Sequence, residues 1–544
     1  MKKQYFLAIA MFMLLTVFAA CSSDDNLDNG KGKVDVASKF EFPVTFADYN
    51  SDVQVGNTRA TANSSDTLKH EFVNMGNGIV ADVTLQRDKE NLSGNPDKSA
   101  STRALTNDSY TMLAYQGGTL KGELKGFISG GSFIPNAGDP ASMSLAPGNY
   151  DFVLYPTSRF TRSGNNLTPP NANEYAILGR TNYTVTATPQ KQKVSFAMKH
   201  TAARVRVRFN TYIKVPQSNF WAYFSATNPA EVPSSAVYDA ATGTWSTSGT
   251  GGSFGFGGSS AWTESGSVTY SYTSPDYSYI FPGSNITNLK VAFSNARIYT
   301  ENLNWKSLTF AINPVLASVA NGSYLISITF HYNFLYLMTD GTTGLFSETT
   351  FGGGTKTPIA VVISQSKNLA AALENTSFSG GSYYSGQVNS SVVNVPSFTP
   401  WIGSGVFSSD GADGYKFTWE ASGSADGTTI KANEQTSYPA FYSAAHYTPT
   451  LPAGKTLTGS IVGKKWFLPS LGEVLRIYPA LKDLDTSAGF YARDMGGGMI
   501  DPSYWQLGMY SPGNPSGMAS MAFRQVNGVL PTGLMITSSQ SDTG

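Results

Sequence analysis

The chain has 544 residues with 37 basic and 37 acidic side chains, and only 14% of its residues are charged. This balance lacks the basic field that nucleic-acid binding requires, and the abundant Gly, Ser, Thr, Asn and aromatic residues are typical of a β-rich extracellular protein. The single cysteine excludes a disulfide framework, and the four histidines are scattered without metal-ligand spacing. We therefore expect about two to four domains that are stabilised by packing and hold no cofactor.

The N-terminus has the pattern of a signal peptide, which we place at residues 1–20. Lys2 and Lys3 precede an apolar run at residues 5–18, which is shorter than the roughly 20 residues of a membrane-spanning helix. Two alanines come directly before Cys21, so the segment resembles a bacterial lipoprotein signal, in which that cysteine becomes the acylated first residue. The alternative is a plain secretory signal with an incidental cysteine.

Residues 22–25, Ser-Ser-Asp-Asp, resemble the export signal of surface lipoproteins in Bacteroides-type bacteria. We therefore expect the protein at the cell outer membrane, exposed on the surface and held by acyl chains on Cys21. Residues 21–38 are polar and Gly-rich, as is typical of a flexible tether between a lipid and a folded domain.

The first folded element is expected at residues 40–46, where apolar and polar residues alternate as in a strand. Pro43 indicates an edge or irregular strand, because proline has no N–H to donate. Another strand-like run at residues 78–85 lies between two polar loops, each of which contains Thr-Arg-Ala, with Arg59 in the first and Arg103 in the second. The simpler interpretation of each arginine is an exposed loop residue.

The clearest strand is expected at residues 144–155, where a Pro-Gly turn leads into a run of β-forming residues. Its partner is expected within residues 194–209. In the second half of that run, small and apolar residues alternate with Arg204, Arg206 and Arg208, which predicts one buried and one solvated face. A polyanion site formed by the three arginines is the alternative.

A second β domain is expected over residues 211–395. A Gly/Ser-rich stretch at 246–260 predicts a long flexible loop, in which Phe254 and Phe256 are weak candidates for sugar contact. The strand-like runs of this domain lie at residues 288–293, 306–312 and 324–330.

The chain changes character in its last part, residues 396–544. A helix is predicted at residues 471–478, because Leu471, Val474, Leu475 and Tyr478 share one face. Ser470 is its expected N-cap. Glu473 is expected to stabilise the start of the helix rather than to act in catalysis.

Aromatic residues gather in the loop-rich segment 489–517, where Tyr504 and Trp505 are weak candidates for ligand binding. The alternative for each ring is a place in the core. The sequence has no Walker loop or zinc-protease motif, and the Gly-x-Ser-x-Gly match at residues 251–255 lacks the strand and helix of a nucleophile elbow. We therefore expect no catalytic residues, no metal site and no enzymatic activity.

Two runs resemble the fimbrillin family of Bacteroides-type bacteria, namely Leu145-Ala-Pro-Gly-Asn-Tyr150 and Met198-Lys-His-Thr-Ala-Ala-Arg-Val-Arg-Val207. Trp466-Phe-Leu-Pro-Ser-Leu-Gly-Glu473 resembles the lectin-like domains attached to some fimbrillins. The resemblance implies a mainly β fold. Two tandem antiparallel β-sandwich domains of transthyretin-like, Greek-key type would occupy residues 39–210 and 211–395, and an α+β lectin-like domain would occupy 396–544. The chain ends without the final strand usual in such lectin-like domains, so it is left open whether the C-terminal domain is complete.

The resemblance also implies a mechanism of assembly. A subunit is made as a lipoprotein whose first strand fills its own sheet, and cleavage after an arginine releases that strand and opens a groove for a strand of a neighbouring subunit. On this interpretation residues 40–46 are the displaced strand. The cut lies between Arg59 and Ala60, in the first loop after that strand, or alternatively between Arg103 and Ala104.

We therefore expect a structural or adhesive subunit of a surface fimbria, in a tip or accessory position because a bulky C-terminal domain suits a filament end. Its expected partners are other fimbrial subunits, the outer membrane through the lipid, and a glycan or protein ligand. The alternative is a permanently anchored glycan-binding lipoprotein that never assembles.

Overall fold

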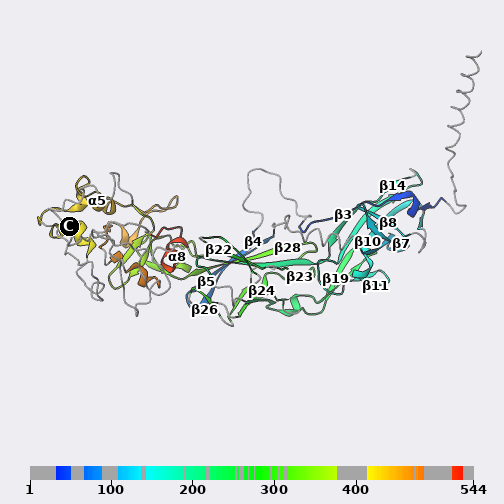
Figure 1. Cartoon of the computed structure of the whole chain (residues 1–544), viewed down its shortest axis with the longest axis horizontal. Helices are drawn as coiled ribbons and strands as arrows, with labels where there is room; N and C mark the ends of the chain where they lie inside the picture. Colours follow the sequence, from blue (N-terminus) through cyan, green and yellow to red (C-terminus); the bar gives the residue numbers. More distant parts are fainter. Residues whose placement is uncertain are drawn as a thin grey trace, which may run out of the picture.

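The computed structural model describes residues 32–50, 67–88, 108–136, 143–188, 191–215, 221–376, 413–482 and 517–530, with short gaps inside the ranges 221–376 and 413–482. The molecule is elongated, and its sheets follow one another along the long axis (Figure 1). The expected mainly β fold is confirmed, with strands forming most of the regular structure.

The first sheet lies at one end of the molecule and contains seven strands (Figure 1). In spatial order they are β3 (Val44–Phe46), β15 (Phe196–His200), β13 (Ile177–Val185), β10 (Gly148–Pro156), β6 (Ser109–Gln116), β7 (Thr119–Ser129) and β8 (Ser132–Pro135). All neighbours run antiparallel except β3 and β15, which are parallel.

The expected pairing of the strand at residues 144–155 with residues 194–209 is wrong. β10 pairs with β13 and β6, and β15 lies one strand further away, beside β13. β13 escaped the sequence analysis because its centre, Gly179 to Asn182, interrupts the apolar pattern that marks a strand.

Two short strand pairs attach the N-terminal residues to the first sheet. We call the first sheet, together with the elements that pack on it, the first unit. β1 (Val34–Asp35) pairs with β9 (Ser144–Leu145), and the short helix α2 (Val36–Lys39) follows it. β2 (Phe40–Glu41) runs parallel to β14 (Gln192–Lys193). Between β2 and β3, Pro43 forms only an isolated bridge, so the predicted irregular strand is confirmed.

A four-stranded sheet covers the other face of the central strands of the first sheet. It has the order β11 (Thr161–Ser163), β12 (Asn166–Thr168), β18 (Ser235–Asp239) and β19 (Thr244–Ser248). Tyr238 packs there against Leu113, Tyr115 and Val153. Because both of their faces are covered, β6 and β10 are buried nearly throughout instead of alternating.

The second large sheet occupies the middle of the molecule (Figure 1). It contains β21 (Thr263–Ser265), β22 (Tyr270–Thr273), β16 (Ala203–Thr211), β28 (Ser323–Tyr332), β5 (Ile79–Arg87) and β4 (Thr67–Gly76), and β23 (Ser278–Ile280) also pairs with β16. Strands from before and after residue 210 thus pair with one another, including the parallel pair β16 and β28. The boundary drawn at residue 210 therefore does not separate the two sheets.

The second sheet packs against a smaller sheet, and the two share one apolar core. Val291 and Phe293 of the smaller sheet meet Val207, Phe209 and Phe330 there. The smaller sheet has the order β20 (Phe254–Gly255), β17 (Trp221–Ala226), β24 (Asn288–Ser294) and β27 (Ser307–Ala311), and a separate pair joins β25 (Arg297–Ile298) to β26 (Glu301–Asn302).

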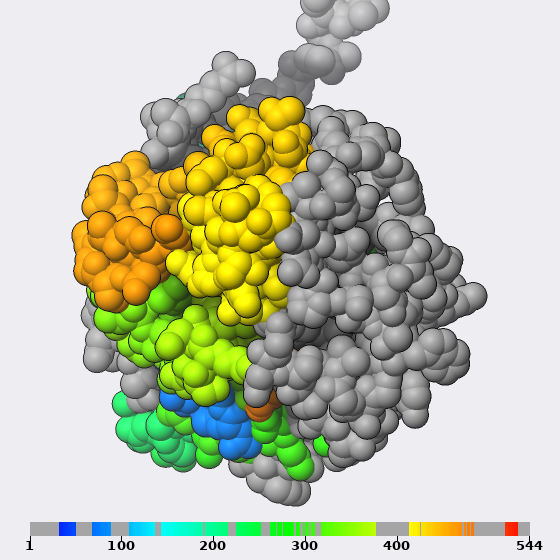
Figure 2. All heavy atoms as spheres, turned by 90° about the vertical axis from the view of Figure 1, so that its left-hand side faces the viewer, coloured from blue at the N-terminus to red at the C-terminus, as the bar shows by residue number. Residues whose placement is uncertain are grey.

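The third region lies at the far end of the molecule, where Figure 2 shows residues 413–482 in yellow and orange beside the green atoms of the preceding sheet. That sheet has the order β30 (Thr343–Leu345), β29 (Leu335–Met338), β31 (Pro358–Ser364) and β32 (Leu369–Ala372). Besides α2, the described helices are α4 (Gly414–Trp419), α5 (Pro439–Ala445), α7 (Ile477–Ala480) and α8 (Met518–Arg524).

Short 3-10 turns occur along the whole described chain. They are η1 (Thr157–Arg159), η3 (Pro229–Glu231), η5 (Phe346–Glu348), η7 (Ala421–Gly423), η8 (Lys431–Asn433) and η9 (Gly459–Ile461).

The predicted cap at Ser470 is present. The Ser470 N–H donates to the Glu473 carboxylate at 2.8 Å, and the Glu473 N–H donates back to Ser470 Oγ at 3.3 Å. This reciprocal pair is a capping box. Burial raises the Glu473 pKa. The helix expected at 471–478 is described as α7 from Ile477, with a helical turn at residues 473–474 before it.

Candidate functional site

Except for Phe254, a weak candidate for sugar contact that begins β20, the residues predicted to carry function lie outside the described part of the chain. They are the lipidation residue Cys21, the cleavage-site residues Arg59, Ala60, Arg103 and Ala104, and the ligand candidates Tyr504 and Trp505. The structure does place the strands on either side of the two loop arginines. Arg59 lies in the connection from β3 to β4, and Arg103 lies in the connection from β5 to β6. The candidate site is therefore the N-terminal segment, which we define as residues 32–50.

The N-terminal segment closes the first sheet, because it bonds to β15 and β8, the two strands that would be outermost without it. On one side, β3 pairs with β15, and the Phe196 N–H donates to the Pro43 carbonyl at 2.8 Å. On the other side, the Phe133 N–H donates to the Phe42 carbonyl at 2.9 Å, and the Val44 N–H donates to the Gly131 carbonyl at 2.8 Å. The segment thus lies between β15, with which β3 pairs, and β8, which it joins through an isolated bridge, and it occupies the position where their edges would otherwise be exposed.

The side chains of the N-terminal segment complete the core of the first unit. Val36, Phe40, Phe42 and Val44 are all buried, whereas Glu41 is exposed. The Phe42 ring meets the Phe133 ring edge-on, with 5.9 Å between their centroids. Full burial of such a side chain stabilises a fold by about 1.5–3 kcal/mol. The apolar alternation read from the sequence therefore marks a strand that is essential to this core.

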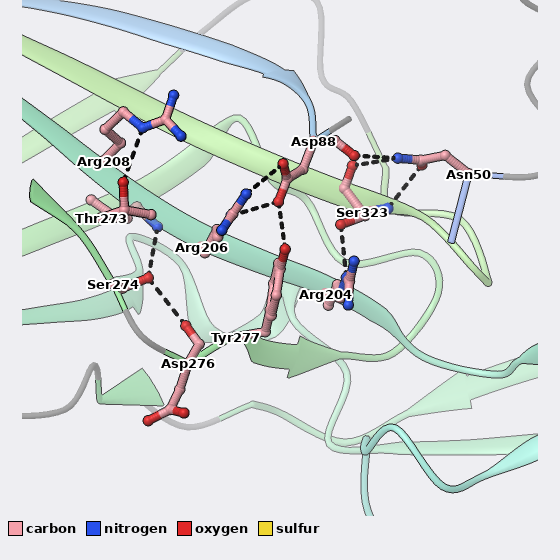
Figure 3. Close-up of polar contacts among 11 residues, drawn as sticks. Asn50, Asp88, Arg204, Arg206, Arg208, Thr273, Ser274, Asp276, Tyr277 and Ser323 are labelled. Atoms are coloured by element: carbon pink, nitrogen blue, oxygen red, sulfur yellow. Dashed lines mark hydrogen bonds and ion pairs between the residues drawn. The ribbon is translucent and has the colours of Figure 1, made fainter. Parts of the chain in front are cut away.

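The end of the N-terminal segment leaves the first unit and contacts the second sheet, and Asn50 makes the main contacts (Figure 3). Its Nδ2 donates to the carbonyls of Asp88 and Ser323, both at 3.1 Å, and its Oδ1 accepts from the Ser323 N–H at 2.9 Å. The Asn50 N–H donates to the Asn321 carbonyl at 2.8 Å. Asn50 has a φ of 61°, a left-handed conformation that asparagine tolerates better than most residues. It thus joins the ends of β5 and β28.

Tyr49 lies between two cationic or ionisable groups. Its ring stacks on the His200 ring at 4.0 Å and 6°, and the Arg204 guanidinium carbon lies 4.0 Å from the Tyr49 centroid. One face of a ring cannot hold both groups at that distance, so they contact opposite faces. Arg204 also lies 3.9 Å from the Tyr277 centroid and donates from Nε to Ser323 Oγ at 2.8 Å.

The expected solvated face of β16 is wrong at its centre. Arg206 and Asp88 form an ion pair, with 2.6 Å between Nε and Oδ2, and their side chains are only 5% and 1% exposed. The Tyr277 hydroxyl donates to the same carboxylate at 2.7 Å (Figure 3). Arg204 and Arg208 are partly buried. The alternation correctly placed the three arginines on one face, but the end of β5 and the loop that carries Tyr277 cover that face.

Burial controls the protonation of the groups around Tyr49. It lowers the pKa of His200 to about 4, and the nearby Arg204 charge adds to this shift. It also raises the pKa of the Tyr49 phenol well above its usual value. The His200 Nδ1 lies 2.9 Å from the Glu174 carbonyl. At neutral pH the ring stack therefore consists of a neutral imidazole, a neutral phenol and a guanidinium.

The signal for this junction was present in the sequence. A Tyr-Asn step at residues 49–50 is separated by two residues from the alternating strand at 40–46, and Asp88 follows the strand-like run at 78–85. Sequence reasoning missed both because their partners come from strands far along the chain. Within the described ranges, no three His, Cys, Asp or Glu side chains come together as a metal site would require. No helix of this part is long and apolar enough to span a membrane.

No protein-family model matches the chain, and no curated protein matches it. Several solved structures are similar. A candidate cell adhesion protein of Bacteroides uniformis is 15% identical, with a TM-score of 0.28 over 41% of this chain and 85% of its own. Another from Bacteroides fragilis is 11% identical, with a TM-score of 0.28 over 56% and 96%. A fimbrial protein of Bacteroides vulgatus is 12% identical, with a TM-score of 0.26 over 43% and 94%. TM-scores and identities this low assign the chain to no family.

Proposed function

We propose that the protein is a structural and adhesive subunit of a surface fimbria, without catalytic activity. It is exported as a lipoprotein through Cys21, cut after Arg59, and assembled when a strand of a neighbouring subunit takes the place of the N-terminal segment. The C-terminal region suits a tip or accessory position, in which it would meet a glycan or protein ligand.

The observation that carries this proposal is the closure of the first sheet by the N-terminal segment. The segment is continuous with the rest of the fold only through residues 51–66, yet it supplies four buried side chains and bonds to both β15 and β8. Its departure would leave two unpaired strand edges and an apolar groove. Such a groove favours binding of another extended segment with alternating apolar residues.

The positions of β4 and β5 favour Arg59 over Arg103 as the cleavage site. A cut after Arg59 removes only the N-terminal segment and its loop. A cut after Arg103 would also remove β5, which lies between β28 and β4 and contributes Ile79, Val83 and Leu85 to the central core. Loss of a central strand and its core side chains would unfold the second sheet in addition to opening the first.

The test is the N-terminal sequence of the protein recovered from the surface of its own host. We expect a start at Ala60 in high-mass species that persist in mild detergent. The Arg59→Gln variant should retain residues 21–59 and stay out of those species. Arg103→Gln is the matched control, because it removes an equivalent loop arginine, and it should process normally.

Two outcomes would contradict the proposal. A lipid-modified Cys21 as the sole N-terminus, with no high-mass species, would favour the permanently anchored glycan-binding lipoprotein. A start at Ala104 in the assembled species would show that β4 and β5 are dispensable, which the packing of the second sheet argues against.

A further inference from the structure

The surface beneath Tyr49 and Asn50 is assembled from parts of the chain that remain after residue 59. We call it the junction slot and define it by His200, Arg204, Tyr277, Asn321 and Ser323. His200 and Arg204 come from the first and second sheets, and Ser323 begins β28. On the proposed function, all five residues stay in the subunit when the N-terminal segment leaves. The slot then loses its present occupant.

One half of the junction slot is shaped for a flat ring. The His200 ring lies parallel to the Tyr49 ring at 4.0 Å, and the Arg204 guanidinium covers the other face at 4.0 Å. Tyr277 holds Arg204 from behind at 3.9 Å, and Ser323 Oγ accepts from its Nε, so the guanidinium is fixed without the occupant. Stacking and cation–π contact both require a π face on the ligand.

The half of the slot that holds the ring offers no hydrogen-bond partner to a phenol hydroxyl. The Tyr49 hydroxyl is buried and has no hydrogen-bond partner among the described residues. A buried hydroxyl without a partner opposes binding, because it loses its bonds to water. The slot should therefore accept phenylalanine at least as well as tyrosine, whereas an aliphatic side chain would lose the stack.

The other half of the slot matches a carboxamide. The slot needs one acceptor and one group that donates twice. Asn50 Oδ1 accepts from the Ser323 N–H and, at 3.5 Å, from Arg87 Nη1, while Asn50 Nδ2 donates to two carbonyls. One oxygen of a carboxylate could accept from Ser323 and Arg87, but the other would place negative charge against the carbonyls of Asp88 and Ser323 and would leave both without a donor. The slot therefore distinguishes asparagine from aspartate, two side chains of nearly the same shape.

We infer that the junction slot is a recognition site for an aromatic residue followed directly by asparagine, carried by the segment of a second subunit that replaces residues 32–50. This inference rests on the proposed function. The apolar groove of the first sheet would accept many strands with alternating apolar residues. The slot at the end of the groove fixes the register of the incoming strand, because the ring and the carboxamide enter it together in only one register.

The experiment uses the mature chain with residues 57–61 replaced by a site for a sequence-specific protease. After cleavage of the folded protein, a fluorescent synthetic peptide of residues 32–50 is added, and its uptake and release are followed by anisotropy. The peptide is compared with Tyr49→Phe, Tyr49→Ala and Asn50→Asp versions. A Glu41→Gln peptide is the matched control, because Glu41 is exposed on the same segment.

We expect the unchanged, Tyr49→Phe and Glu41→Gln peptides to be retained alike, and the Tyr49→Ala and Asn50→Asp peptides to be released about tenfold faster or more. In the Arg204→Met protein, the difference between the Tyr49→Ala and unchanged peptides should shrink. Equal release of all five peptides from a protein that takes them up would overturn the slot and leave the proposed function intact. Failure of every peptide to exchange would overturn the proposed function, and the slot with it.

Discussion

At the scale of single residues, a buried histidine makes the stability of this protein depend on pH. His331 in β28 is 6% exposed, and its ring stacks on Phe346 of η5 at 4.6 Å. Neither ring nitrogen has a hydrogen-bond partner among the described residues. Burial lowers its pKa to about 4, whereas an unfolded histidine titrates near 6.5. The unfolded chain therefore binds the proton more readily between these two values.

This difference predicts a loss of stability on acidification. The stability that depends on a neutral His331 is complete above about pH 6.5 and falls as the pH drops toward 4, and the loss has reached about 2–3 kcal/mol at pH 4.5. Thermal unfolding at pH 7 and pH 4.5 should show a smaller acid-induced loss in His331→Leu than in the unchanged protein. His446→Gln, which changes an exposed histidine, is the control. An unchanged acid-induced loss in His331→Leu would contradict the prediction.

The residue scale also shows where sequence reasoning stopped. Alternation placed Arg204, Arg206 and Arg208 on one face of a strand, and the structure has them on one face of β16. It could not reveal that Asp88 and Tyr277 cover Arg206, because these partners lie on other segments. Periodicity predicts to which face of a strand each side chain points, whereas the partner of a buried charge depends on the tertiary fold.

At the scale of elements, the N-terminal segment contributes more to the first unit than its length suggests. Phe42 is 2% exposed and packs against Phe40 and Phe133. Phe42→Ala should leave a cavity that costs about 3–5 kcal/mol, and this loss should appear first as easier opening of the segment. Hydrogen exchange at the amides of Phe133 and Phe196, which donate to the segment, should accelerate by about 100-fold or more.

Glu41→Ala is the matched control for this measurement, because it changes an exposed side chain on the same strand and keeps the backbone bonds. Equal acceleration in both variants would point to a general loss of stability. No acceleration in Phe42→Ala would show that the segment is held by its hydrogen bonds alone.

Elements were predictable to different degrees. The strands at residues 78–85, 203–209 and 324–330 were recognisable from their apolar pattern, and the structure has strands there. The pairing of β16 with β28 in parallel, and of β5 with β28, was not, since register between distant strands depends on packing. The weak pattern of β13 led to the wrong neighbour for β10.

At the scale of the whole molecule, residues 517–530 are part of the central fold. Helix α8 buries Met518, Met521 and Phe523 in the core of the second sheet. Gln525 bonds to both backbone groups of Tyr332, accepting from its N–H at 3.1 Å and donating to its carbonyl at 2.7 Å. The last described helix of the region 396–544, which we expected to be a separate lectin-like domain, thus packs into the core of the second sheet.

Gln525→Ala should therefore weaken the whole molecule rather than a separate end domain. It leaves the buried N–H and carbonyl of Tyr332 without these partners, which should cost about 1–3 kcal/mol. Denaturation followed by tryptophan fluorescence should show one transition at lower denaturant. Val529→Ala, which shortens an exposed side chain in the same stretch, should leave the midpoint unchanged. An early transition confined to the C-terminal region would contradict this prediction.

The place of β5 in the chain has a consequence for the order in which the protein acquires its structure. The hairpin β4–β5, with Asn77 and Gly78 at its turn, is made early, but β28 is made only after all the strands of the first sheet. During synthesis the first unit can close while the hairpin still has an apolar face without a partner. Between the synthesis of the hairpin and that of β28, aggregation competes with folding, and a chaperone bound to the apolar face of the hairpin would protect the chain.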